Sequence, residues 1–71
     1  MKKGDFVECL KSRDIYITTG SRYKVLAVEG DDDIVCGGLV EPNGFIIAKD
    51  DGKAIYCLAT ESCAFGLWEL Q

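Results

Sequence analysis

The sequence predicts an all-β fold, a small β-barrel of five to six antiparallel strands. Its apolar residues alternate with a period of two, and Gly, Asp and Asn-Gly clusters interrupt the apolar runs roughly every eight to twelve residues. The chain has 71 residues, of which 48% are hydrophobic and 28% charged, so it forms a single domain spanning residues 1–71 around one core. Thr60 is a suitable N-cap, which predicts one short 3-10 or helical turn near residues 61–64.

The first half of the chain predicts three strands separated by one long and one acidic connection. Residues 5–10 form the first strand, and residues 11–21 form a long loop with an apolar centre. Residues 23–28 are apolar on both faces, which indicates a strand that is covered on both sides. The acidic turn 31–33 leads into a strand at 34–40, where two adjacent glycines indicate a bulge or a sharp bend.

The second half predicts a tight hairpin and a short terminal strand. Pro, Asn and Gly at 42–44 form a turn into the strand 45–49. The Asp-Gly pair at 51–52 is the strongest hairpin signal of the chain and connects this strand to the strand 53–59. Residues 67–70 complete the sheet.

Composition and charge disfavour an enzyme and a general nucleic-acid binder. The chain has no histidine, which removes Ser-His and Cys-His nucleophile pairs and the commonest catalytic zinc ligand. We therefore expect no catalytic residue. The net charge of −4 divides into six basic against three acidic residues in 1–24, and two basic against nine acidic residues in 25–71. Acidity weakens binding to phosphates.

The four cysteines are expected to be free thiols. Cys9, Cys36, Cys57 and Cys63 are separated by 27, 21 and 6 positions, without a C-x-x-C pair. The chain starts without the apolar run of a signal peptide and has no membrane-spanning segment, so we expect a cytoplasmic protein. A reducing compartment favours thiols, although a disulfide framework or a zinc site stays open. We expect no metal and no cofactor.

The element order resembles that of an Src-homology-3-like (SH3-like) barrel, and the local motifs resemble small uncharacterised phage and prophage proteins. The matching positions are those of a Gly-Asp-x-Val-x-Cys start, a Gly-x-x-Tyr-x-Val strand and an Asp-Asp-Gly turn: Gly4, Asp5, Val7, Cys9, Gly20, Tyr23, Val25, Asp50, Asp51 and Gly52. The segment 31–44 is longer than a minimal barrel needs, and Leu67-Trp68-Glu69-Leu70 replaces the expected Phe-Glu. The resemblance implies a phage-derived SH3-like domain that modulates a host protein, and it assigns no catalytic residue.

Aromatic residues are the first candidates for a partner-binding surface. Tyr16, Tyr56 and Trp68 could line a groove beside the long loop, where Arg13 and Arg22 add positive charge. The alternative is that these rings fill the core. The basic loop and the absence of an Ala-Leu-Tyr-Asp-Tyr run disfavour recognition of proline-rich peptides.

Acidic turns are the second candidate, because turns gather at the ends of a barrel. Asp31, Asp32, Asp33, Asp50 and Asp51 could share one acidic rim. Such a rim could bind Ca²⁺, imitate the charge of DNA, or steer the domain onto a basic partner. The alternative is that these residues serve turn geometry and solubility.

The sequence therefore predicts a small non-enzymatic protein-binding module, and the resemblance implies a phage- or prophage-encoded modulator of a host protein in the host cytoplasm. The alternatives are a nucleic-acid-associated barrel that uses the basic N-terminal stretch, and an acidic DNA-mimic inhibitor. A homo-oligomer and a monomer stay equally open, because an uncovered strand edge can pair with a second chain.

Overall fold

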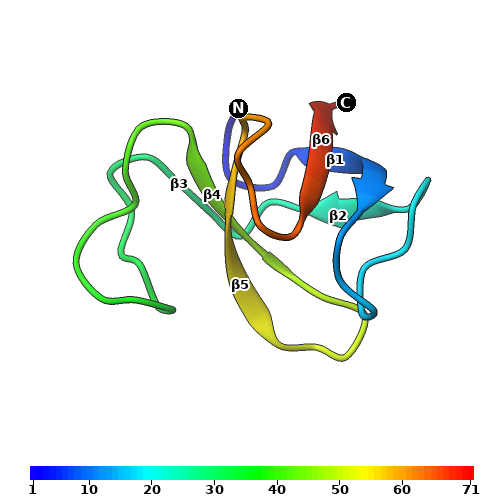
Figure 1. The fold of residues 1–71 in the computed structure, drawn as a ribbon. Coiled ribbons are helices and arrows are strands. Elements are labelled where there is room, and N and C mark those ends of the chain that lie inside the picture. The colour runs from blue at the N-terminus through cyan, green and yellow to red at the C-terminus, as the bar shows by residue number, and fades with distance from the viewer.

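Six antiparallel strands form two three-stranded sheets in the computed structural model, which describes all 71 residues (Figure 1). The prediction of an all-β chain with five to six antiparallel strands is confirmed. The strands are β1 (Phe6–Ser12), β2 (Arg22–Lys24), β3 (Ala27–Val28), β4 (Gly44–Ala48), β5 (Ala54–Leu58) and β6 (Gly66–Leu70). The tight hairpin between β4 and β5 turns at Gly52, which has a φ of +84°.

The strand order is β2-β1-β6 in one sheet and β3-β4-β5 in the other, and the two sheets do not close into a barrel. In the first sheet β1 is the central strand, with Val7 opposite Tyr23 of β2 and Cys9 opposite Trp68 of β6. The register shifts after Cys9, which leaves Leu10 as an extra residue at a bulge.

Two predicted strands differ from the structure. The strand predicted at 23–28 is divided between the sheets, because the Val25 N–H donates to Asp5 O and the Leu26 N–H donates to Ile46 O. The chain crosses from one sheet to the other at this point. The strand predicted at 34–40 is a turn, with one isolated bridge from Asp32 to Leu39.

The glycine pair explains why residues 34–40 do not extend. Gly37 and Gly38 have φ angles of +85° and +77°, which reverse the chain where a strand would continue.

At the 3-10 or helical turn predicted near residues 61–64 the structure has one hydrogen-bonded turn, and no 3-10 or α-helical segment forms. The Cys63 N–H donates to Thr60 O, which closes a single turn, and no helix follows. The Arg13 guanidinium donates to the carbonyl oxygens of Glu61 and Cys63 at 3.0 and 2.7 Å. A long-range partner thus takes the carbonyl groups that a helix would use, which is an interaction that local sequence does not reveal.

The main core lies between the two sheets. Its inward side chains come from alternate positions of the strands, with Val7 and Cys9 on β1, Phe45 and Ile47 on β4, and Cys57 on β5, all fully buried. Trp68 of β6 packs edge-on against Tyr23 of β2 and Phe45 of β4, with ring centroids 5.7 and 5.8 Å apart. The indole ring therefore contacts both sheets.

A second, smaller core covers the opposite face of the sheet that contains β4. Ile46 is fully buried there against Ala27 and Val40, and Tyr56 packs beside them. Val40 belongs to the long segment between β3 and β4, so the end of this segment is anchored on the sheet. This second core explains why the strand at residues 44–48 is apolar on both faces.

Replacing Gly66 by Ala should destabilise the fold by about 2 kcal/mol, because the added Cβ overpacks a strand pair. It would lie 2.7 Å from the backbone oxygen of Lys11 and 3.5 Å from Cys9 Sγ. Urea unfolding measures the change, with exposed Glu69→Ala in the same strand as the control. Equal stability of the two variants would contradict the close packing of β1 on β6.

Candidate protein-binding surface

The segment between β3 and β4 projects away from the two sheets (Figure 1). Residues 29–43, the acidic loop, contain five acidic residues and no basic residue. The acidic residues are Glu29, Asp31, Asp32, Asp33 and Glu41. A net charge of −5 is thus concentrated on one protrusion of a chain whose total net charge is −4.

The acidic loop has a defined hydrogen-bonded structure. The Asp33 side chain is buried, and its Oδ1 accepts the N–H groups of Val35 and Cys36 at 2.9 Å each. The backbone N–H of Asp33 donates to Gly38 O, and Asp31 Oδ2 accepts the Val28 N–H. The loop therefore presents its outer side chains from a fixed backbone, which reduces the entropy lost on binding.

Three apolar side chains stand exposed on this loop. Ile34 is 72% exposed, Leu39 is 62% exposed and Val35 is 42% exposed. Single exposed apolar residues are ordinary, but three of them lie here within six positions of one loop, and we call these three the apolar tip. Covering such side chains gains about 25 cal/mol for each Å² of apolar area removed from water.

Shallow hollows flank the acidic loop on two sides. One, of about 280 Å³, is lined by Asp33, Cys36, Gly37, Leu39, Glu41 and Tyr56. The other, of about 410 Å³, is lined by Lys3, Leu26, Ala27, Asp31, Asp32 and Ile34. Both hollows combine carboxylates with apolar side chains, so a matching surface needs positive charge beside apolar groups.

The three aromatic residues predicted for a groove lie in three different surroundings. Trp68 is partly buried, packing against the main core beside Phe45 and lining a shallow hollow with Leu10 and Leu67, whereas Tyr56 lies opposite Ile46 beside the second core. Phe45 and Ile46 are consecutive on one strand and face opposite sides of its sheet. Trp68, which contacts Phe45, and Tyr56, which lies beside Ile46, therefore lie on opposite sides of that sheet. Tyr16 lies in the long loop after β1 and is 46% exposed.

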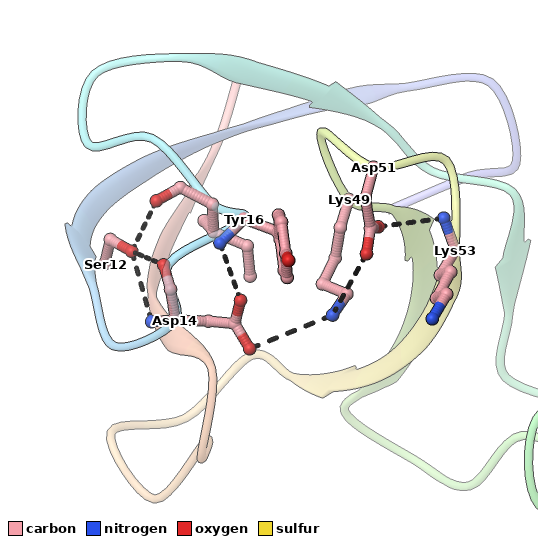
Figure 2. A network of polar contacts seen from close by, with 7 residues as sticks. Ser12, Asp14, Tyr16, Lys49, Asp51 and Lys53 are labelled. Atoms are coloured by element: carbon pink, nitrogen blue, oxygen red, sulfur yellow. Dashed lines mark hydrogen bonds and ion pairs between the residues drawn. The ribbon is translucent and has the colours of Figure 1, made fainter.

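Tyr16 belongs to a polar network that joins this loop to the β4–β5 turn (Figure 2). Lys49 Nζ lies 5.1 Å from the centroid of the Tyr16 ring and 3.9 Å from carboxylate oxygens of both Asp14 and Asp51. The Lys49 side chain is only 12% exposed, so these partners replace much of its hydration. This network holds the loop in place.

The predicted acidic rim is divided between the two ends of β4. Asp31, Asp32 and Asp33 precede this strand on the acidic loop, whereas Asp50 and Asp51 follow it. Asp50 and Asp51 are engaged within the molecule. Asp50 accepts hydrogen bonds from the Tyr23 and Thr18 hydroxyl groups at 2.9 and 2.7 Å. Burial and the Asp50 carboxylate raise the pKa of Tyr23, although the Thr18 N–H partly offsets them.

The two predicted arginines lie near the long loop after β1. Arg22 is the first residue of β2, lies opposite Glu8 of β1 and is exposed. Arg13 is exposed, but its guanidinium group binds the carbonyl oxygens of Glu61 and Cys63. Arg22 is therefore the freer of the two cations for a partner.

The thiols divide into one exposed and three buried groups, all of them free as predicted. Cys36 is exposed on the acidic loop, whereas Cys9, Cys57 and Cys63 lie in the main core. Burial raises the pKa of Cys9 and of Cys57. No three Cys, Asp or Glu side chains are grouped so that they could hold a metal ion.

Cys63 differs from the other buried thiols because it is surrounded by N–H groups. Burial alone would raise its pKa, but backbone amides of Leu58, Phe65 and Gly66 and the indole of Trp68 together lower it. Trp68 Nε1 is buried without a hydrogen-bond partner, and its N–H is one of the groups that lower the pKa of Cys63. This arrangement stabilises the turn before β6.

The apolar tip was not among the sites predicted from the sequence. Ile34, Val35 and Leu39 were assigned to a strand, because their β-branched and aliphatic side chains suit one. The available signal was the Gly-Gly pair within that segment, together with the acidic residues on both sides. A turn was the better interpretation of that combination.

Comparisons with protein-family models, with curated proteins and with solved structures find no match to this chain. The structure contains no helix of the length and apolar character that crossing a membrane requires.

Cys36 should be the only thiol that reacts rapidly with iodoacetamide in dilute solution. The other three thiols should react roughly several thousandfold more slowly, because they become accessible only when a fold with ~5 kcal/mol of stability opens. Mass spectrometry of the intact chain counts the modified groups, and Cys36→Ser is the control that should remove the rapid phase. Rapid modification of two or more thiols would contradict the buried cluster.

Proposed function

We propose that this chain is a non-enzymatic protein-binding module that contacts a partner protein through its acidic loop. The observation that carries the proposal is the apolar tip of Ile34, Val35 and Leu39, which is exposed on a rigid loop with a net charge of −5. Apolar side chains supply binding energy, and the surrounding carboxylates select a cationic surface and accelerate association.

The chemistry of the partner follows from this surface. It offers an apolar groove that receives the tip, with Lys or Arg side chains around the rim that face the carboxylates. Ionic contacts at such a rim are weakened by salt, whereas the apolar contacts are not. The absence of histidine from the sequence supports a binding role over acid-base catalysis.

The same proposal includes an SH3-like barrel topology and a phage or prophage origin. The element order supports the first, since a long loop follows the first strand and a tight hairpin precedes the terminal part of the chain. The resemblance of the Gly-Asp-x-Val-x-Cys start supports the second. In this proposal the partner is a host protein in the host cytoplasm.

The charge of the acidic loop supports a second candidate, an inhibitor that imitates the phosphate charges of DNA. Five carboxylates on one protrusion could occupy the nucleic-acid site of a basic protein. The exposed apolar tip favours the first candidate, because phosphate groups offer no apolar equivalent. Competition by duplex DNA for the captured partner separates the two candidates.

The test is affinity capture from a nuclease-treated bacterial host lysate with dilute bait. We expect a stoichiometric protein partner with the wild-type chain, and an at least tenfold loss, about 1.4 kcal/mol, with Ile34→Ser/Leu39→Ser. Ile15→Ser is the matched control, because Ile15 is 88% exposed but lies in a different loop. Equal recovery of the partner protein with all three baits would contradict the proposal. So would a partner that is recovered from untreated lysate and lost from nuclease-treated lysate.

A further inference from the structure

A second apolar and charged loop lies at the other end of the molecule. Residues 11–22, the basic loop, run from the end of β1 to the start of β2 and contain three basic residues and one acidic residue. Figure 1 shows the acidic loop and the basic loop on opposite sides of the two sheets. The chain therefore carries a loop of charge +2 and a loop of charge −5 that face away from each other.

The basic loop has its own exposed apolar tip. Ile15 is 88% exposed, the largest value among the exposed apolar residues, and Tyr16 beside it is 46% exposed. The neighbouring Ile17 is buried in the main core, and the Tyr16 N–H donates to Asp14 Oδ1 at 2.8 Å. Because Ile17 and Asp14 fix the backbone on both sides, Ile15 projects from a rigid support.

We propose that the acidic loop of one molecule packs against the basic loop of a second copy of this chain. The inference rests on the proposed role of the acidic loop as a contact surface. In addition, the second copy covers this loop until a host protein displaces it. Ile34 and Leu39 of one copy meet Ile15 of the other, while Glu29, Asp32 and Glu41 face Lys11 and Arg22.

The charges select a second copy as the occupant. The acidic loop needs a surface that combines positive charge with an apolar centre. The basic loop of the same chain provides both: the Asp14 and Asp51 carboxylates pair with Lys49 and that of Asp50 accepts two hydroxyl groups, whereas Lys11 and Arg22 have no such partner. Two acidic loops would repel each other, as would two basic loops. The contact therefore joins unlike ends of two molecules.

The size of a stable interface favours a reciprocal contact. A standard protein interface covers about 800 Å² on each partner, which is about a fifth of the 4314 Å² accessible surface of this chain. One loop tip is too small to supply this area. When two molecules lie side by side in opposite directions, each acidic loop reaches the basic loop of the other copy, and both contacts form at once.

Charge reversal with compensation is the direct test. Lys11→Glu/Arg22→Glu changes the basic loop from +2 to −2, and Glu29→Lys/Asp32→Lys/Glu41→Lys changes the acidic loop from −5 to +1. These side chains make no hydrogen bond or ion pair within the molecule, unlike those of Asp31, Asp33 and Arg13. Sedimentation equilibrium over a wide concentration range gives the solution mass, and urea unfolding checks that each variant is folded.

We expect the wild-type mass to rise toward twice that of the monomer with concentration, and to return to the monomer value at about 1 M salt, where the Debye length is ~3 Å. Each variant alone should stay monomeric, and an equimolar mixture of the two should associate again, because each loop then meets the opposite charge. Lys2→Glu/Lys24→Glu is the control, with the same change in net charge outside both loops, and it should associate like the wild type.

A wild-type chain that is monomeric at every concentration, or a mixture that does not associate, would overturn the proposal. Alkylation of Cys36 supplies a second readout, because this exposed thiol lies in the acidic loop. Its modification should slow as the wild-type concentration rises, and an unchanged rate would count against the contact. Ile15→Ser should weaken self-association but should still capture the host partner from the lysate. Failure of the self-association proposal is therefore distinguishable from failure of the proposed function.

Discussion

The packing of Trp68 between Tyr23 and Phe45 is the interaction on which the rest of the structure depends. A chain of 71 residues without a helix has only two small sheets to bury against each other. Trp68 belongs to one sheet and packs edge-on against a ring from each. The fully buried side chains of Val7, Ile47 and Cys57 fill the space around these rings.

This core determines where the binding surfaces lie. The chain changes sheets at Val25 and Leu26, so the first loop connects two strands of one sheet, whereas the segment after β3 connects two strands of the other. Each loop is then anchored by one buried aliphatic residue, Ile17 for the basic loop and Val40 for the acidic loop. The unlike charges of the sequence are therefore held apart on opposite sides of a rigid body.

The period of two and the Asp-Gly turn could be predicted because each depends on residues that are neighbours in the sequence. The division of residues 23–28 between two sheets could not, since it depends on hydrogen bonds from Val25 and Leu26 to distant strands. The turn after Thr60 likewise depends on Arg13, which lies 48 positions before Glu61. The sequence predicts a short 3-10 or helical turn there, whereas the chain forms one hydrogen-bonded turn, and the Glu61 and Cys63 carbonyl oxygens accept hydrogen bonds from Arg13.

The candidate surface was predicted in part. The sequence identifies the acidic residues at 31–33 as a candidate surface, but it predicts a strand with a bulge or sharp bend at 34–40 and does not single out Ile34 and Leu39 as exposed. Burial at these positions depends on whether a second sheet packs against them, and the alternation of apolar residues in the sequence does not predict this packing. The sequence favours the aromatic residues as a binding surface instead, although the partly buried Trp68 packs against the main core with its indole near Cys63.

Residue-resolved amide hydrogen exchange tests most directly the claim that a two-sheet core carries the acidic loop as a separate surface. We expect the core amides of β1 and β4 to exchange only by global unfolding, whereas the amides of Val35 and Cys36 should exchange by local opening, which needs less free energy. Equal protection of these loop amides and the core amides would show that the loop is part of the folding core, and would contradict its role as a separate surface.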